Sequence, residues 1–111
     1  MGPFIEANSS LVVTRKTLGS ASAKVPYTCS WETMTFTFSA TSIPGYQNLT
    51  SSNFIANHSS GYNTSDQKRM LTSAPTISYN ASSGVVTVYG SAATWCNEST
   101  YSVTCYAFYN G

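Results

Sequence analysis

Charged side chains are scarce in this sequence. They make up 8% of its 111 residues and leave a formal net charge of +1, whereas an average soluble domain is roughly 25% charged. A protein that binds a nucleic-acid backbone needs several Lys or Arg side chains grouped on one surface, and the adjacent pairs here are only Arg15–Lys16 and Lys68–Arg69. We therefore expect no nucleic-acid partner, and a surface wetted by the hydroxyls and amides of the abundant Ser, Thr and Asn.

The groups that catalysis and metal binding require are also few. The chain has one histidine, His58, and four acidic residues, Glu6, Glu32, Asp66 and Glu98. General acid–base catalysis requires one titratable group to be held in place by a second, and His58 has no acidic neighbour in the sequence. The cysteines and the histidine lack the short paired spacing of structural zinc sites. We expect a protein that is not an enzyme and that uses neither a metal nor a cofactor.

Cysteine occurs three times, at Cys29, Cys96 and Cys105. An odd number fits poorly with a closed disulfide framework. Cys96 and Cys105 are spaced as candidates for a disulfide across a hairpin, which would leave Cys29 over. The interpretation that we favour is three small buried thiols in a chain made in a reducing cytosol.

Long apolar runs are missing too. No stretch approaches the roughly 20 apolar residues of a transmembrane helix, and the N-terminal residues show no basic start followed by the apolar run of a secretion signal. We expect no membrane span. Two origins of the chain stay open. Either a secretion signal has been removed, or the chain is made in a cytosol and acts there or in a particle.

Aromatic residues, by contrast, are plentiful. Eight Tyr, five Phe and two Trp make up 14% of the chain. Disordered segments combine low hydrophobicity with high net charge and few aromatics, so we expect a folded chain. Its length suits one domain, residues 1–111, with a core large enough to need no metal.

Hydrophobicity alternates along the chain with a period of two, which is typical of half-buried strands. The clearest strand is 31–40, in which Met34, Phe36 and Phe38 share one side and Trp31 shares the other with a run of Thr. A hairpin is predicted over 76–89, with its loop closed by a glycine in the left-handed conformation. If Asn80 pairs with Val85, the cross-strand partners on its apolar face are Tyr79 with Val86 and Ile77 with Val88.

Further elements follow from the same pattern and from turn residues. Strands are predicted at 10–17, 25–29, 93–95 and 100–109, a loop at 19–22, turns at 43–46 and 97–99, a polar loop at 59–66, and one short helix near 52–57 capped by Ser51 or Ser52. The fold class is therefore all-β, a single antiparallel β-sandwich or small barrel of about six or seven strands. The expected core residues are Met34, Phe36, Phe38, Ile77, Tyr79, Val86, Val88, Val103 and Cys105.

Six of the eight asparagines stand in Asn-x-Ser/Thr sequons, at positions Asn8, Asn48, Asn57, Asn63, Asn80 and Asn97. An excess of sequons suits a glycosylated secreted domain. The alternative, which we favour, is that turn chemistry places Asn beside Ser.

Several aromatic residues fall outside the expected core, namely Tyr46, Tyr62, Tyr89, Trp95, Tyr106 and Phe108. Such a set suits a sugar-binding platform or an interface with a neighbouring subunit. We favour the interface, and its candidate residues are Trp95, Tyr106, Phe108 and Tyr89.

The segment 76–88, TISYNASSGVVTV, is similar to hairpins in the small accessory proteins of tailed-bacteriophage virions. The whole chain resembles such decoration, head-fibre and tail proteins in its short all-β body, its Ser, Thr, Asn, Tyr and Gly content and its scarcity of charge. The resemblance implies a non-enzymatic structural, decoration or attachment protein that acts by subunit packing in the virion, with reduced cysteines. Its partners would be copies of itself or other virion proteins, and a host-surface glycan is a further candidate. Two alternatives remain, an extracellular adhesin or carbohydrate-binding module, and a glycosylated secreted immunoglobulin-like domain.

Overall fold

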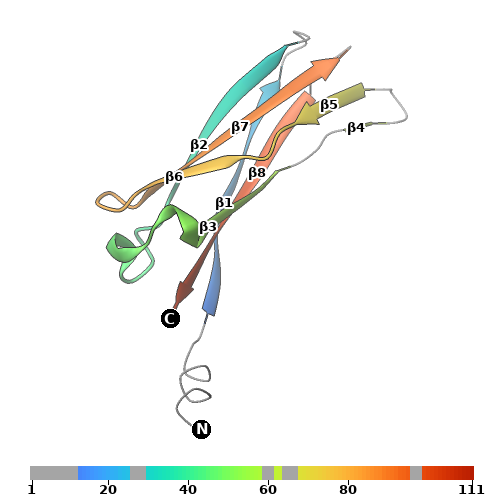
Figure 1. The fold of residues 1–111 in the computed structure, drawn as a ribbon. Helices are drawn as coiled ribbons and strands as arrows, with labels where there is room; N and C mark the ends of the chain where they lie inside the picture. The colour runs from blue at the N-terminus through green and yellow to red at the C-terminus, as the bar shows by residue number, and fades with distance from the viewer. Residues whose placement is uncertain (1–12, 26–29, 59–61, 64–67, 96–98) are drawn as a thin grey trace, which may run out of the picture.

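The computed structural model describes residues 13–25, 30–58, 62–63, 68–95 and 99–111, which form two antiparallel sheets packed face to face (Figure 1). Sheet A has the order β1–β8–β3, and its strands are β1 (Val13–Val25), β8 (Ser99–Asn110) and β3 (Phe54–His58). Sheet B contains β2 (Trp31–Ser39), β7 (Val85–Trp95), β5 (Lys68–Thr72), β4 (Tyr62–Asn63) and β6 (Thr76–Asn80). The predicted all-β sandwich is confirmed.

Strand β7 organises sheet B, because β2 pairs along one of its edges while β6 and β5 share the other. Residues 73–75 interrupt that second edge between β5 and β6, where Pro75 has no N–H to donate to a ladder. The backbone N–H of Ser73 still donates to the carbonyl of Ser91 at 3.2 Å. Because β7 runs from Val85 to Trp95, the predicted strand at 93–95 is the continuation of β7 and not a separate element.

The hairpin β6–β7 has the predicted register, with Asn80 opposite Val85, Tyr79 opposite Val86 and Ile77 opposite Val88. Gly84 adopts the left-handed conformation with φ of 74°. The side-chain oxygen of Asn80 accepts hydrogen bonds from the backbone N–H groups of Ser82 at 3.1 Å and Ser83 at 3.3 Å, which closes the loop. The predicted turn at 43–46 is also present, since the N–H of Tyr46 donates to the carbonyl of Ile43 at 3.1 Å.

The loop predicted at 19–22 is wrong, because β1 runs through it. Strand β1 pairs with β8 along its whole length, and the register shifts once between Thr17 and Gly19. Such a bulge inserts an extra residue without ending the strand, so small residues that favour turns are held extended by their partner strand. The predicted strands at 10–17 and 25–29 lie partly outside the described residues.

The helix predicted near 52–57 is also wrong. Ser51–Asn53 forms a single 3-10 turn with Thr50 at its N-cap position, and β3 then runs from Phe54 to His58. Phe54 is buried and Ile55 exposed, so this segment alternates with the period of a strand. β4 likewise lies within the predicted polar loop at 59–66.

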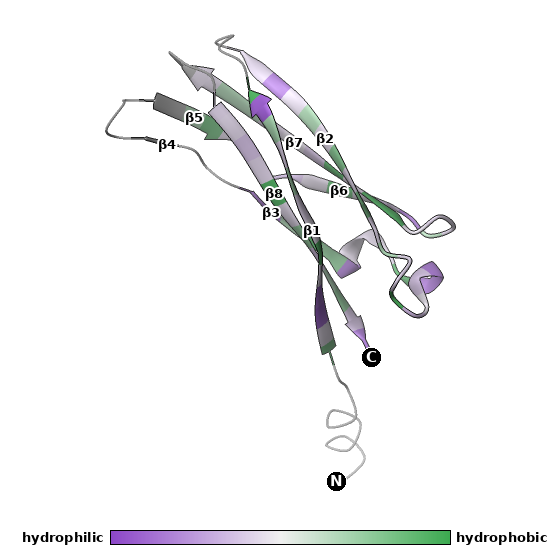
Figure 2. Cartoon of the chain, turned by 180° about the vertical axis from the view of Figure 1, so that it is seen from behind, coloured by the Kyte–Doolittle hydropathy of each residue, from purple (hydrophilic) through white to green (hydrophobic). Residues whose placement is uncertain are grey.

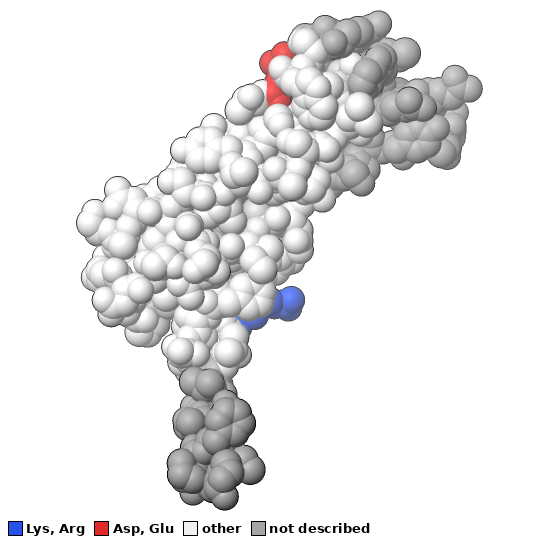
Figure 3. Space-filling view, in the orientation of Figure 1, with Lys and Arg blue, Asp and Glu red and all other residues white. Residues whose placement is uncertain are grey.

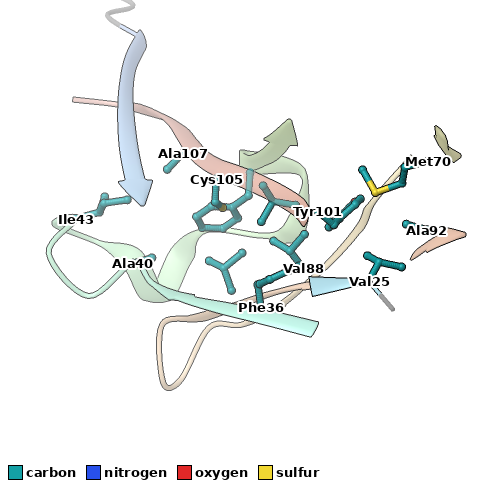
Figure 4. Packing of buried hydrophobic residues seen from close by; sticks show 13 residues of the cluster. Val25, Phe36, Ala40, Ile43, Met70, Val88, Ala92, Tyr101, Cys105 and Ala107 are labelled. Carbon is teal, nitrogen blue, oxygen red and sulfur yellow. The ribbon is translucent and has the colours of Figure 1, made fainter. Parts of the chain in front are cut away.

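The core lies between the sheets (Figure 4), and Figure 2 shows polar and apolar residues interspersed along the strands, as a period of two requires. All nine predicted core residues belong to this cluster, five of them buried and four partly buried. Among the buried members of the cluster, the largest that the prediction did not include are Tyr101, Phe54, Ile43 and Met70.

Candidate functional surfaces

A stack of three rings is the most chemically distinctive feature of the interior. The ring of Tyr101 lies 6.1 Å from that of Phe36 and 6.0 Å from that of His58, with interplanar angles of 17° and 22°. Tyr101 is fully buried, and its hydroxyl has no hydrogen-bond partner among the described residues. Burial raises the pKa of this hydroxyl. A Cβ atom at Gly90 would lie 2.5 Å from the Tyr101 oxygen, so the ring occupies space that only a glycine leaves open.

His58 has a hydroxyl neighbour, since its Nε2 atom lies 3.1 Å from the Thr72 Oγ1 atom. Within the described ranges, no group of three or more His, Cys, Asp or Glu side chains is arranged to hold a metal ion. In the same part of the chain, no helix is long and apolar enough to cross a membrane.

Cys105 lies on the inward side of β8 and is fully buried. It is a free thiol, so the disulfide proposed between Cys96 and Cys105 is not formed. The hairpin on which that disulfide was based is absent, because β7 and β8 belong to different sheets. Cys96, Cys29 and the predicted turn residues 97–98 lie outside the described residues. Burial raises the pKa of the Cys105 thiol to about 11, which keeps it protonated and a poor nucleophile at neutral pH.

The outward side of sheet A, hereafter face A, carries an aromatic patch made of Arg15, Ile55, Tyr106 and Phe108. Tyr106 lies opposite Ile55 on one side, and Arg15 lies opposite Phe108 on the other. The Arg15 guanidinium carbon lies 5.2 Å from the centre of the Tyr106 ring, a cation–π distance. Ile55 is 48% exposed, and Val13 extends the apolar surface at the end of β1.

The outward side of sheet B, hereafter face B, carries five cross-strand rows of uncharged residues whose side chains are described. Successive rows are Trp31–Ala93–Leu71, Thr33–Ser91–Ser73, Thr35–Tyr89–Thr76, Thr37–Thr87–Ser78 and Ser39–Val85–Asn80. Figure 3 looks onto this face, and the charged atoms visible in it are confined to the rim. Trp31 is 54% exposed and Tyr89 43% exposed.

The four predicted interface residues do not form one site. Tyr106 and Phe108 lie together on face A, Tyr89 lies on face B, and the side chain of Trp95 is outside the described part of the chain. Tyr46 is part-buried against the core, where its carbonyl accepts a hydrogen bond from the Tyr79 hydroxyl at 2.5 Å. The side chain of Tyr62 is not described either. A single platform made of all the predicted rings is therefore wrong.

Trp31 and Ile55 were not among the candidate site residues predicted from the sequence. The alternation of 31–40 placed Trp31 on the outward side, so the signal was available for that residue. The helix predicted near 52–57 hid the outward position of Ile55. Among the sequons, Asn48, Asn57 and Asn80 are exposed, whereas Asn8 and Asn97 and the side chain of Asn63 lie outside the described residues.

Comparison with known proteins found no matching family model, no matching curated protein and no matching solved structure.

Proposed function

We propose that this chain is a non-enzymatic structural subunit of a virus particle, and that it packs against copies of itself through the aromatic patch of face A. The observation that carries the proposal is the grouping of Tyr106, Phe108, Ile55 and Arg15 on one outward sheet face. Aromatic residues and Arg are enriched in protein interfaces and supply most of their hot spots. A hydrophobic patch with one cation held over a ring therefore suits contact with protein.

The scarcity of charge supports packing in many copies. Surfaces with a large net charge repel each other at long range, and this chain carries a formal net charge of only +1. Identical subunits are therefore able to sit side by side without strong repulsion.

Contact through face A is favoured over pairing along the edge of β1 that no described strand covers. That strand contains the bulge near Gly19, and Lys16 lies in the half-buried, inward-facing register opposite the buried Ala107. Bulges and inward-pointing charges on an edge strand oppose edge-to-edge pairing. Copies would then meet through side chains of face A, with the backbone edge left unpaired.

Sedimentation velocity over a range of chain concentrations tests this proposal. We expect reversible association that Phe108→Asp weakens by tenfold or more, roughly the effect of losing a hot-spot side chain. The matched control is Tyr89→Asp on face B, which should associate like the parent. A chain that stays monomeric at the highest concentration, or equal weakening by both substitutions, would contradict the proposal.

Whether the chain belongs to a virus particle is tested by a second measurement. The mass of the native assembly recovered with its neighbours should correspond to many copies of this chain on a larger body. Recovery as a free single chain would exclude the virus-particle assignment.

A further inference from the structure

We propose that face B is a second binding surface, and that its ligand is a neutral polysaccharide stacked on Trp31 and Tyr89. Face B lies on the sheet opposite to the aromatic patch and shares none of its residues. It gives the chain an attachment function in addition to packing.

The two rings are exposed and lie in separate rows of the same face. Trp31 is in the first row, and Tyr89 is in the third, opposite Thr35. Four residues of strand separate these rows, which corresponds to about 13 Å along the sheet. A ligand that covers both rings must therefore be extended, and an oligomer fits this requirement better than a single small molecule.

The row between the rings consists of hydroxyls, from Thr33, Ser91 and Ser73. The Oγ atoms of Ser73 and Ser91 lie 2.5 Å apart, so this pair is already held in place. Each hydroxyl is both a donor and an acceptor, and Thr side chains are restricted at their first torsion angle. Binding to such groups loses little side-chain entropy.

The alternation of ring, hydroxyl row and ring matches the chemistry of a sugar chain. A pyranose presents a face of C–H groups that stacks on an aromatic ring and a rim of hydroxyls that bonds to other hydroxyls. Tyr offers a ring and a polar group together at low entropic cost. No side chain in the five rows is charged, so an anionic polymer would find no Lys or Arg between Trp31 and Tyr89 to bind its acid groups. The next row of the register pairs Arg69 with Trp95, and the side chains of that row lie outside the described part of the chain.

A protein partner fits face B less well. Its exposed apolar residues are not contiguous, since the hydroxyl-rich rows separate the Trp31–Leu71 row from Val85 at the other end. Ser is depleted in protein interfaces relative to the rest of the surface, whereas it recurs in the rows of this face. Face A, with adjacent Tyr106 and Ile55, has the contiguous apolar surface that face B lacks.

Isothermal titration calorimetry of the full chain with cellohexaose, chitohexaose, maltohexaose and mannohexaose tests the proposal, with polygalacturonate as the anionic comparison. We expect saturable binding of at least one neutral oligosaccharide. Trp31→Ala and Tyr89→Ala should each weaken that binding by roughly two- to tenfold, the range expected for one ring-stacking contact. Both residues are exposed, and circular dichroism spectra that match the parent would show that the variants fold.

The control variants separate this proposal from self-association. Tyr106→Ala on face A should bind the oligosaccharide like the parent, and Phe108→Asp should bind it even as a monomer. Failure of all four neutral oligosaccharides to bind at millimolar concentration would overturn the proposal. So would preferential binding of polygalacturonate, or binding that survives in the Trp31→Ala/Tyr89→Ala double variant.

Discussion

Tyr101 places a hydroxyl in the core where no described residue bonds to it. A buried polar group without a partner lowers stability by roughly 1–3 kcal/mol. Tyr79 provides the internal contrast, because its hydroxyl donates to the carbonyl of Tyr46. The two tyrosines therefore differ in the contribution of one oxygen atom, while both rings pack against the same core.

Removing these two hydroxyls should have different consequences. We expect Tyr101→Phe to leave the free energy of unfolding unchanged or to raise it, because an unbonded oxygen is lost. Tyr79→Phe should lower it by about 0.5–1.5 kcal/mol, the usual net contribution of one hydrogen bond. Urea denaturation of both variants checks this, and a larger loss for Tyr101→Phe than for Tyr79→Phe would contradict it.

Cys105 should make stability depend on pH in the alkaline range. Burial raises its pKa from 9.0 to about 11 in the folded chain, so folding favours the protonated thiol. Its contribution is fully present below pH 9 and is lost as pH rises from 9 to 11. Burial also raises the pKa of Tyr79 and Tyr101, which adds a loss in the same direction at higher pH.

The measurement is the free energy of unfolding at pH 8, 9, 10 and 11 for the parent and for Cys105→Ala. We expect a shallower decline in the variant, whatever its stability at pH 8. Parallel declines would show that the thiol does not contribute. Cys105 of the native parent should also fail to react with a thiol reagent at pH 8, as peptide mass spectrometry would show.

Among the elements, those with strict alternation were predicted from the sequence, whereas β3 and the second half of β1 were not. Residues 31–40 and the hairpin 76–89 carry their own signal, because apolar side chains face one side and Gly84 permits the loop. In β1, the small polar residues at 19–22 favour a loop by local composition. Pairing with β8 nevertheless holds them in a strand, because strand propensity depends strongly on tertiary context. In β3, the five-residue segment Phe54–His58 is too short for its alternation to exclude a helix.

Phe36 should be the critical side chain of β2. It is 8% exposed and stacks on Tyr101 across the sandwich. Phe36→Ala should lower the free energy of unfolding by about 3–5 kcal/mol, as large-to-small core substitutions do. The neighbouring Thr35→Ala points outward and should change it by no more than about 0.5 kcal/mol. A denaturation midpoint for Phe36→Ala equal to that of the parent would show that the face assignment is wrong.

At the scale of the molecule, the described chain is a thin elongated sandwich of 60 × 32 × 17 Å with two chemically different faces. Face A has an aromatic patch with Arg15, and face B has hydroxyl rows with two exposed rings. The sequence predicted an interface at outward-facing aromatic residues, and two of them, Tyr106 and Phe108, lie on the same face. It did not assign residues to separate faces, because that depends on which strands share a sheet, and β7 and β8 are consecutive in sequence yet lie in opposite sheets.

Hydroxyl-radical footprinting of the parent chain at low and high concentration distinguishes packing through face A from packing through face B, because it reports each aromatic side chain separately. We expect Tyr106 and Phe108 to become protected as the chain associates, while Trp31 and Tyr89 keep the reactivity that they have at low concentration. Constant reactivity at Tyr106 and Phe108, or protection of Trp31 and Tyr89 in their place, would contradict packing through face A.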